Sequence, residues 1–216
     1  MTQDASIGRG RSFVAAHWRS MPGVAIAGSV AFLILLALLH LLRPDLDPSW
    51  RFISEYEMGA HGWLMQLAFL CLGVSTAAIA LALMPIAGGV AGRLGIALLC
   101  VSATGMFLAS LFLPDVKGGL HDMGAMLDQI PFAALLIQWR LSRDALGRST
   151  SWTFAVLPMA TFVLFMVAMA VQLPRNGGRP GPEVLVGWPN RLMILAQCAW
   201  LIHTGWCLLR RRSDDA

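Results

Sequence analysis

The most informative feature of this sequence is its small number of charged residues. Only 13% of the 216 residues are Asp, Glu, Lys or Arg, whereas 57% are hydrophobic. Charged residues normally make up about 25% of a soluble globular domain. A water-exposed surface of this size would need more polar residues than the chain supplies. The shortage excludes an ordinary soluble domain and predicts a membrane protein.

Several functional signatures are also missing. The four cysteines lie within apolar stretches and form no CxxC pair, so they indicate neither a disulfide framework nor a redox motif. The sequence contains no Gly-x-Ser-x-Gly elbow and no HExxH motif. The net charge of +4 comes from basic residues that flank apolar stretches without interleaved aromatic residues, which argues against nucleic acid as a partner. The sequence leaves the cofactor unknown, and a haem held by two histidines is an alternative to the metal site considered below.

Six apolar stretches are present instead, each near the ~20 residues that a helix needs to cross a bilayer. Lipid cannot form hydrogen bonds with the backbone N–H and C=O groups of open strands, so every span should be helical. The sequence therefore predicts an all-α integral membrane bundle of six transmembrane helices. We expect an N-terminal segment (1–22), a six-helix domain (23–210) and a short tail (211–216). The predicted spans are 23–42, 60–84, 93–113, 120–139, 152–173 and 187–209.

The basic residues predict an orientation. If the N-terminus lies in the cytoplasm, ten Arg residues fall on the cytoplasmic side, and six Arg or Lys residues fall on the other. Cytoplasmic loops carry the excess of Arg and Lys in membrane proteins. Both termini are therefore expected in the cytoplasm. Most acidic residues fall on the opposite side, and since acidic residues contribute little to orientation, we expect this distribution to have a functional cause.

The segment 43–59, after the first span, mixes apolar and ionic residues too closely for a solvated linker. We expect its apolar side chains to lie at the headgroup level or on the bundle and thereby to position Ser54 and Glu55. Two interpretations remain open. The segment either caps the helix ends at the interface or lines a pocket. The apolar residues in question are Trp50, Phe52, Ile53 and Tyr56.

The fourth span carries the most unusual polar residues. In a single helix, seven residues make nearly two turns, so His121 would lie over Asp128 and Asp122 over Gln129. The sequence then predicts one polar face that reaches into the bilayer, where ionisable side chains are costly. Pro131 would free the carbonyl of Leu127.

Arg191, near the start of the sixth span, offers a counter-charge at the same level. Three interpretations are open: a buried ion pair that fixes packing, a substrate or proton site, and an arginine that snorkels to the interface. Asn190 and Gln197 are also seven residues apart and should share a face. The predicted acidic partners of Arg191 are Asp115, Asp122 and Glu55.

Three histidines fall at a similar depth, at the ends of the first, second and fourth spans. Together with Asp122 they could form a metal site, because zinc accepts His and carboxylate ligands. No HxxxH spacing supports this, so they are weak candidates. His17 and His203 are expected to be ordinary packing or interface residues. The three candidates are His40, His61 and His121.

Three motifs resemble a prokaryotic six-helix family that is catalogued as a domain of unknown function, DUF998. They are Ile53 to Tyr56 followed by Gly59 and Gly62 to Met65, then Leu113 to Asp115 leading to Gly119 to His121, then Gly187 to Arg191. The likeness implies six helices, a shared outer site and a bacterial inner membrane location, but it supplies no catalytic residues. Glu57 departs from the pattern, which has a small or apolar residue there. More distantly, the loop is similar to the Frag/DRAM/Sfk group, which implies a link to lipid distribution.

Three functional hypotheses follow. In the first, an extracytoplasmic polar pocket binds a lipid or small amphiphile, with Arg191 on an anionic headgroup and His121 and Asp122 exchanging a proton. In the second, the protein is a non-catalytic subunit of a larger membrane complex. In the third, it is a hydrolase or transferase that uses His121 as a base together with Asp122, and one variant of this hypothesis adds a metal. The predicted pocket residues are Glu55, Asp115, His121, Asp122, Asp128 and Arg191.

Overall fold

A computed structural model describes residues 3–114, 119–142, 149–178 and 181–214. All regular secondary structure in these ranges is helical, which confirms the predicted all-α class. The elements are α1 (Gln3–Leu42), η1 (Ile53–Glu57), α2 (Gly62–Leu83), α3 (Gly89–Leu111), α4 (Leu120–Met126), α5 (Ile130–Leu141), α6 (Ser149–Gln172), η2 (Leu173–Asn176) and α7 (Gly187–Asp214).

Within the described ranges, five helices are long and apolar enough to cross a membrane. Their outward faces carry large apolar side chains, such as Ile34, which is 61% exposed, as lipid-facing helices require. The spanning segments are Ser20–Leu42, Gly62–Leu83, Gly89–Leu111, Ser151–Asn176 and Gly187–Arg211.

Exposed tryptophans mark two levels along the bundle. Trp63 and Trp188 lie near the starts of α2 and α7, and Trp139 and Trp206 lie near the ends of α5 and α7. Tryptophan is enriched at both membrane–water interfaces. Along α7, the rise from Trp188 to Trp206 is about 27 Å, close to the ~30 Å thickness of a hydrocarbon core. These side chains fit the two interfaces.

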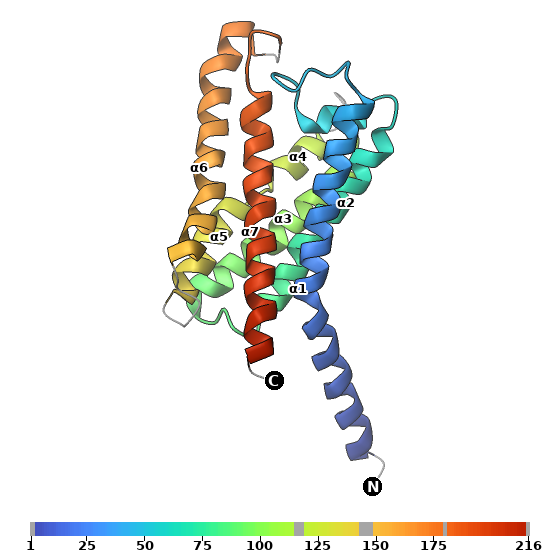
Figure 1. Ribbon diagram of the computed structural model, residues 1–216, viewed down its shortest axis with the longest axis vertical. Helices are drawn as coiled ribbons and strands as arrows, with labels where there is room; N and C mark the ends of the chain where they lie inside the picture. The colour runs from blue at the N-terminus through green and yellow to red at the C-terminus, as the bar shows by residue number, and fades with distance from the viewer. Residues whose placement is uncertain (1–2, 115–118, 143–148, 179–180, 215–216) are drawn as a thin grey trace.

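Both termini lie at the same end of the bundle, and the segment between α1 and α2 lies at the opposite end (Figure 1). We call these the terminus end and the polar end; the polar end comprises residues 43–61 and the starts of α2, α4 and α7. The shared position of the termini is what six crossings require. Which end faces the cytoplasm stays a prediction.

The predicted fourth span is not one helix. It is divided into α4 and α5, with Leu127–Gln129 between them. Irregular backbone at membrane depth needs partners within the protein. Here, the Gln129 amide donates to Ser102 Oγ (2.7 Å), and the Ile130 amide donates to Asp128 Oδ1 (3.2 Å). Pro131 occupies the first turn of α5, where no intrahelical N–H is needed.

Because of this break, the polar face predicted for the fourth span does not form. Because the helix axis is interrupted before Asp128, His121 and Asp128 do not stack on one straight helix, and neither do Asp122 and Gln129. α4 is held against α3 by a close backbone approach. A Cβ atom added to Gly105 or Gly124 would collide with the backbone carbonyl of the other. This contact, together with the bond to Ser102, fixes the broken span on α3.

Candidate functional site

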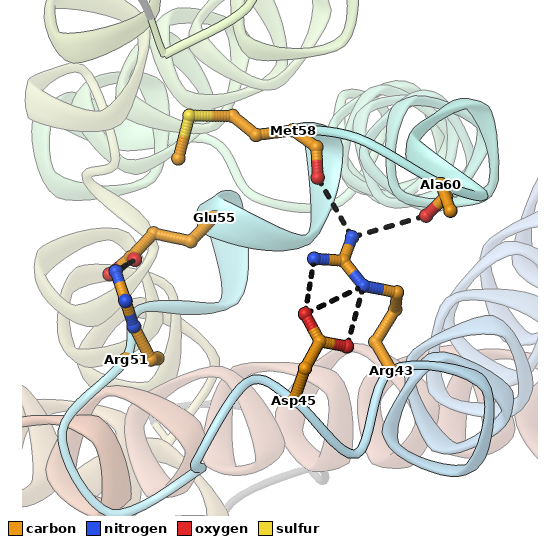
Figure 2. A network of polar contacts seen from close by, with 6 residues as sticks. All are labelled: Arg43, Asp45, Arg51, Glu55, Met58 and Ala60. Atoms are coloured by element: carbon orange, nitrogen blue, oxygen red, sulfur yellow. Dashed lines mark hydrogen bonds and ion pairs between the residues drawn. The ribbon is translucent and has the colours of Figure 1, made fainter.

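Arg43 closes the polar-end loop. Its Nε and Nη2 donate to the Asp45 carboxylate (2.9 and 2.8 Å), and its Nη1 donates to the carbonyls of Met58 (2.8 Å) and Ala60 (3.1 Å). Figure 2 shows the guanidinium between the two ends of the loop. The hydrogen bond from Arg43 lowers the pKa of the exposed Asp45 carboxyl. One side chain at the end of α1 therefore fixes the chain that leads into α2.

The Ile53–Tyr56 motif forms a capped turn. Glu55 accepts from the Phe52 amide through Oε1 (3.0 Å) and from Arg51 Nη1 through Oε2 (2.5 Å; Figure 2). Ile53 and Tyr56 are buried, and the Ile53 amide donates to Asn190 Oδ1 on α7 (3.1 Å). The predicted aromatic and aliphatic anchors thus position Glu55. The geometry favours the interfacial cap over a pocket lining.

Arg191 joins three elements at the polar end. Its Nε donates to His40 Nε2 (2.8 Å), and its Nη1 donates to the carbonyls of Arg51 (2.7 Å) and Gly187 (3.1 Å). A guanidinium can only donate, so His40 Nε2 must be unprotonated, while its Nδ1 donates to Leu36 O (2.7 Å). His40 is therefore the neutral imidazole, and α1, the loop and α7 are connected through one cation.

The predicted ion pairs of Arg191 are wrong for two of the three partners. Glu55 pairs with Arg51 instead, and Asp122 is exposed. Asp115 lies outside the described residues. The Arg191 side chain is also not a snorkelling arginine, because only 4% of the residue is exposed. Its guanidinium bonds directly to carbonyl groups and to the His40 ring, while the carboxylates of Glu55 and Asp47 act on its charge at longer range.

Glu57 and His121 form a second buried contact. His121 Nδ1 lies 3.5 Å from Glu57 Oε2 and donates to the Phe112 carbonyl at 3.0 Å. Glu57 is 3% exposed, and neither of its carboxylate oxygens has a hydrogen-bond partner among the described residues. Burial raises the pKa of Glu57 to about 8. Glu57 is therefore mainly protonated at neutral pH, and it was not among the predicted site residues.

Asp128 and Gln197 form a third contact, deeper in the bundle. Gln197 Nε2 donates to Asp128 Oδ2 at 2.6 Å, and both residues are buried. Asp128 also accepts from the Ile130 amide at the start of α5. The side chain thus ties the helix break to α7. This contact gives Asp128 a structural role within the protein interior.

The predicted site residues are not brought together in one chamber. Arg191, His121 and Asp128 take part in three separate contacts, Glu55 caps a turn, and Asp122 is exposed. Whether any of them binds a ligand stays a prediction.

The three predicted metal candidates do not converge either. Both ring nitrogens of His40 are engaged, and His61 is exposed, with a left-handed backbone (φ 63°) before α2. His121 faces Glu57 and the Phe112 carbonyl. In the part of the chain that the structure describes, no group of three or more His, Cys, Asp or Glu side chains could hold a metal ion.

Sequence reasoning missed an open cavity of about 410 Å³ on the membrane-spanning surface. We call it the apolar groove. It lies along α7, which packs against α1 on one side and α6 on the other (Figure 1). A helical stripe on α7 could have indicated it, since five lining residues follow one face of that helix. The lining residues are Leu33, Phe154, Leu195, Ala199, Ile202, His203 and Trp206.

A second, smaller cavity of about 20 Å³ lies beside the groove, between α5, α6 and α7. His203 lines both cavities. Its ring stacks on Phe154 (centroids 4.2 Å apart), and its Nε2 lies 3.3 Å from Ser151 Oγ. The expectation that His203 is a packing residue is consistent with these contacts, which also make it the wall between the two cavities.

Comparison with known proteins supplies a family and no further relative. No curated protein and no solved structure matches the chain. The model of one family, described as "Protein of unknown function (DUF998)", matches residues 26–207, which include three spanning helices and the broken one in full and most of the first and last spans. The chain therefore belongs to the DUF998 family of membrane proteins.

Proposed function

We propose that this protein binds a lipid or small amphiphile, whose hydrocarbon chain lies in the apolar groove. The observation that supports this most is the groove itself: about 410 Å³ of space within membrane-spanning segments, with apolar lining apart from His203. Ligand pockets typically have about 300–1,000 Å³ and mostly apolar walls. A hydrocarbon chain fits such walls, whereas a polar solute would lose its hydrogen bonds there.

The position of the groove suits an amphiphile. Trp206 lines it near the terminus end, and the Arg210 guanidinium lies 5.0 Å from the centre of the Trp206 ring. A chain in the groove would therefore have an interfacial aromatic residue and a cation near its headgroup level. With both termini in the cytoplasm of a bacterium, as the basic residues suggest, this is the cytoplasmic leaflet of the inner membrane.

In this proposal, the hydrogen bonds at the polar end hold the helices that line the groove. Arg191 ties α7 to α1 through His40, and Asn190 ties α7 to the loop. These bonds hold two walls of the groove at a fixed separation. An extracytoplasmic ligand pocket is less well supported, because the polar atoms of Arg191, Asp128 and Glu55 bond within the protein. The hydrolase hypothesis pairs His121 with Asp122, whereas Asp122 is exposed and the carboxyl group beside His121 is that of Glu57.

The test is photolabelling of the purified protein in bilayers with a lipid that carries a diazirine on its acyl chain. We expect labels to concentrate on the segment 195–206 of α7. The substitution Ala199→Phe should fill the groove and reduce labelling there several-fold. Ala37→Phe is the matched control, because Ala37 is exposed on α1 and does not line the groove.

Two results would contradict the proposal. Labels spread evenly over all lipid-facing helices would mean that the groove holds only bulk lipid. Cross-links from residues 195–206 to a helix of another polypeptide would favour the accessory-subunit hypothesis.

A further inference from the structure

The small cavity beside the groove is lined by several polar side chains at the terminus end. Gln138 comes from α5, Ser151 from α6, and His203 and Thr204 from α7. Its volume of about 20 Å³ is enough for one water-sized group. Trp139 is the neighbour of Gln138 in the sequence and is exposed at the level of the interface. The cavity therefore lies near the depth at which the polar head of an amphiphile meets its chain.

One hydrogen-bond donor in this cavity is unused. Gln138 is only 7% exposed, and its Nε2 is buried with no hydrogen-bond partner among the described residues. Leaving a buried donor unsatisfied costs about 1–3 kcal/mol. An oxygen atom placed in the cavity would accept from this amide and remove that cost.

The wall shared by the cavity and the groove connects this donor to the proposed chain site. His203 faces the groove beside Phe154 and faces the cavity beside Ser151. A ligand that passes His203 could place its chain among Leu195, Ala199 and Ile202 and its terminal oxygen at Gln138. The described lining of the cavity contains no Arg or Lys, so a charged head would be buried without a counter-charge.

We infer that the ligand is a neutral amphiphile, a hydrocarbon chain that ends in an uncharged oxygen group, and that this oxygen binds Gln138 Nε2 in the cavity beside His203. The inference rests on the proposed function, since the chain must lie in the groove. It adds the class of ligand and the residue that selects it. The chemistry involved is hydrogen bonding alone, and no bond is made or broken.

The test is competition in the same photolabelling assay. A long-chain alcohol and the alkane of equal length compete against the diazirine lipid for residues 195–206. We expect the alcohol-to-alkane competition ratio of the wild type to exceed that of a variant without the Gln138 donor about 3- to 10-fold, the effect of roughly one hydrogen bond. Comparing the alcohol-to-alkane ratio between variants cancels the different partitioning of the two compounds into the bilayer.

The substitution Gln138→Met keeps the side-chain size and removes the donor, so the ratio should fall about 3- to 10-fold below that of the wild type. Gln66→Met is the matched control, because Gln66 is half-buried on α2 and lines neither cavity; its ratio should equal that of the wild type. If Gln138→Met does not fold, Gln138→Leu provides a second variant that also lacks the donor and has the same expected direction.

The outcomes separate the two claims. Labelling of the groove with a ratio that Gln138→Met leaves unchanged overturns the inference and leaves the proposed function standing. Labelling that Ala199→Phe does not reduce overturns the proposed function and the inference together.

Discussion

The substitution Glu57→Gln should remove a pH dependence from the stability of this protein. Glu57 is buried beside His121, and burial raises its pKa from 4.5 to about 8. In the unfolded chain the carboxyl loses its proton above about pH 4.5, whereas the folded protein keeps it until about pH 8. The folded state thus binds more protons in this window, so its stability falls as the pH rises.

The size of the effect follows from the two pKa values. Each pH unit between them corresponds to about 1.4 kcal/mol, so the whole window costs on the order of 5 kcal/mol. For a chain of about this length, that amounts to a decrease of about 10–20 °C in Tm. Above about pH 8 the carboxyl is ionised in both states, and this contribution becomes constant.

The assay is thermal unfolding in detergent between about pH 5 and about pH 9. The wild type should lose stability over this range relative to Glu57→Gln, whose amide does not titrate. Glu183→Gln is the control, because Glu183 is exposed, and it should follow the wild type. Equal pH dependence in the wild type and Glu57→Gln would refute the reasoning and mean that Glu57 is ionised throughout.

Two further substitutions test the polar contacts of the fold in the same unfolding assay. Arg191→Lys keeps the charge but loses the planar set of donors, and should destabilise the protein by about 2–4 kcal/mol; Arg175→Lys, at an exposed position, should have little effect, and equal losses would contradict the assigned role. Ser102→Ala removes the acceptor of the Gln129 amide at the helix break and should cost about 1–3 kcal/mol. Ser110→Ala removes a hydroxyl that bonds only to its own helix and should cost less; the reverse order would mean that the break needs no partner from α3.

Five of the six spans could be predicted from hydropathy alone, because long apolar segments leave the backbone no alternative to a helix in lipid. The predicted stretch 187–209 corresponds to α7, and the stretch 60–84 to α2. The prediction of the fourth span as one helix was wrong because composition does not specify whether a helix continues without a break. Pro131 is compatible with a helix interior that bends and with a helix that starts anew. The choice depends on whether a neighbour can satisfy the free amides, and that neighbour is Ser102, distant in the sequence.

The partners at the polar end were predictable only where they are local. The Arg51–Glu55 ion pair has i,i+4 spacing, although sequence reasoning assigned Glu55 to Arg191 instead. The bond between Arg191 and His40 spans most of the chain, and it depends on how α1 and α7 pack. Glu57 shows the same limit, because its position in the sequence does not indicate that its carboxyl group is buried without hydrogen-bond donors.

The apolar groove was missed for a different reason. Polar residues are conspicuous in an apolar sequence, whereas a groove between lipid-facing helices is lined by the commonest residues of a membrane span. Only the spacing of α1 and α6 around α7 makes those side chains a cavity.

The most direct measurement for the proposed amphiphile site is a structure of the purified protein in a lipid nanodisc. Our account predicts an ordered, elongated density along Leu195, Ala199 and Ile202 that ends at Gln138 and is lost in Ala199→Phe. A groove without ordered density, or one filled by a helix from a second polypeptide, would contradict it.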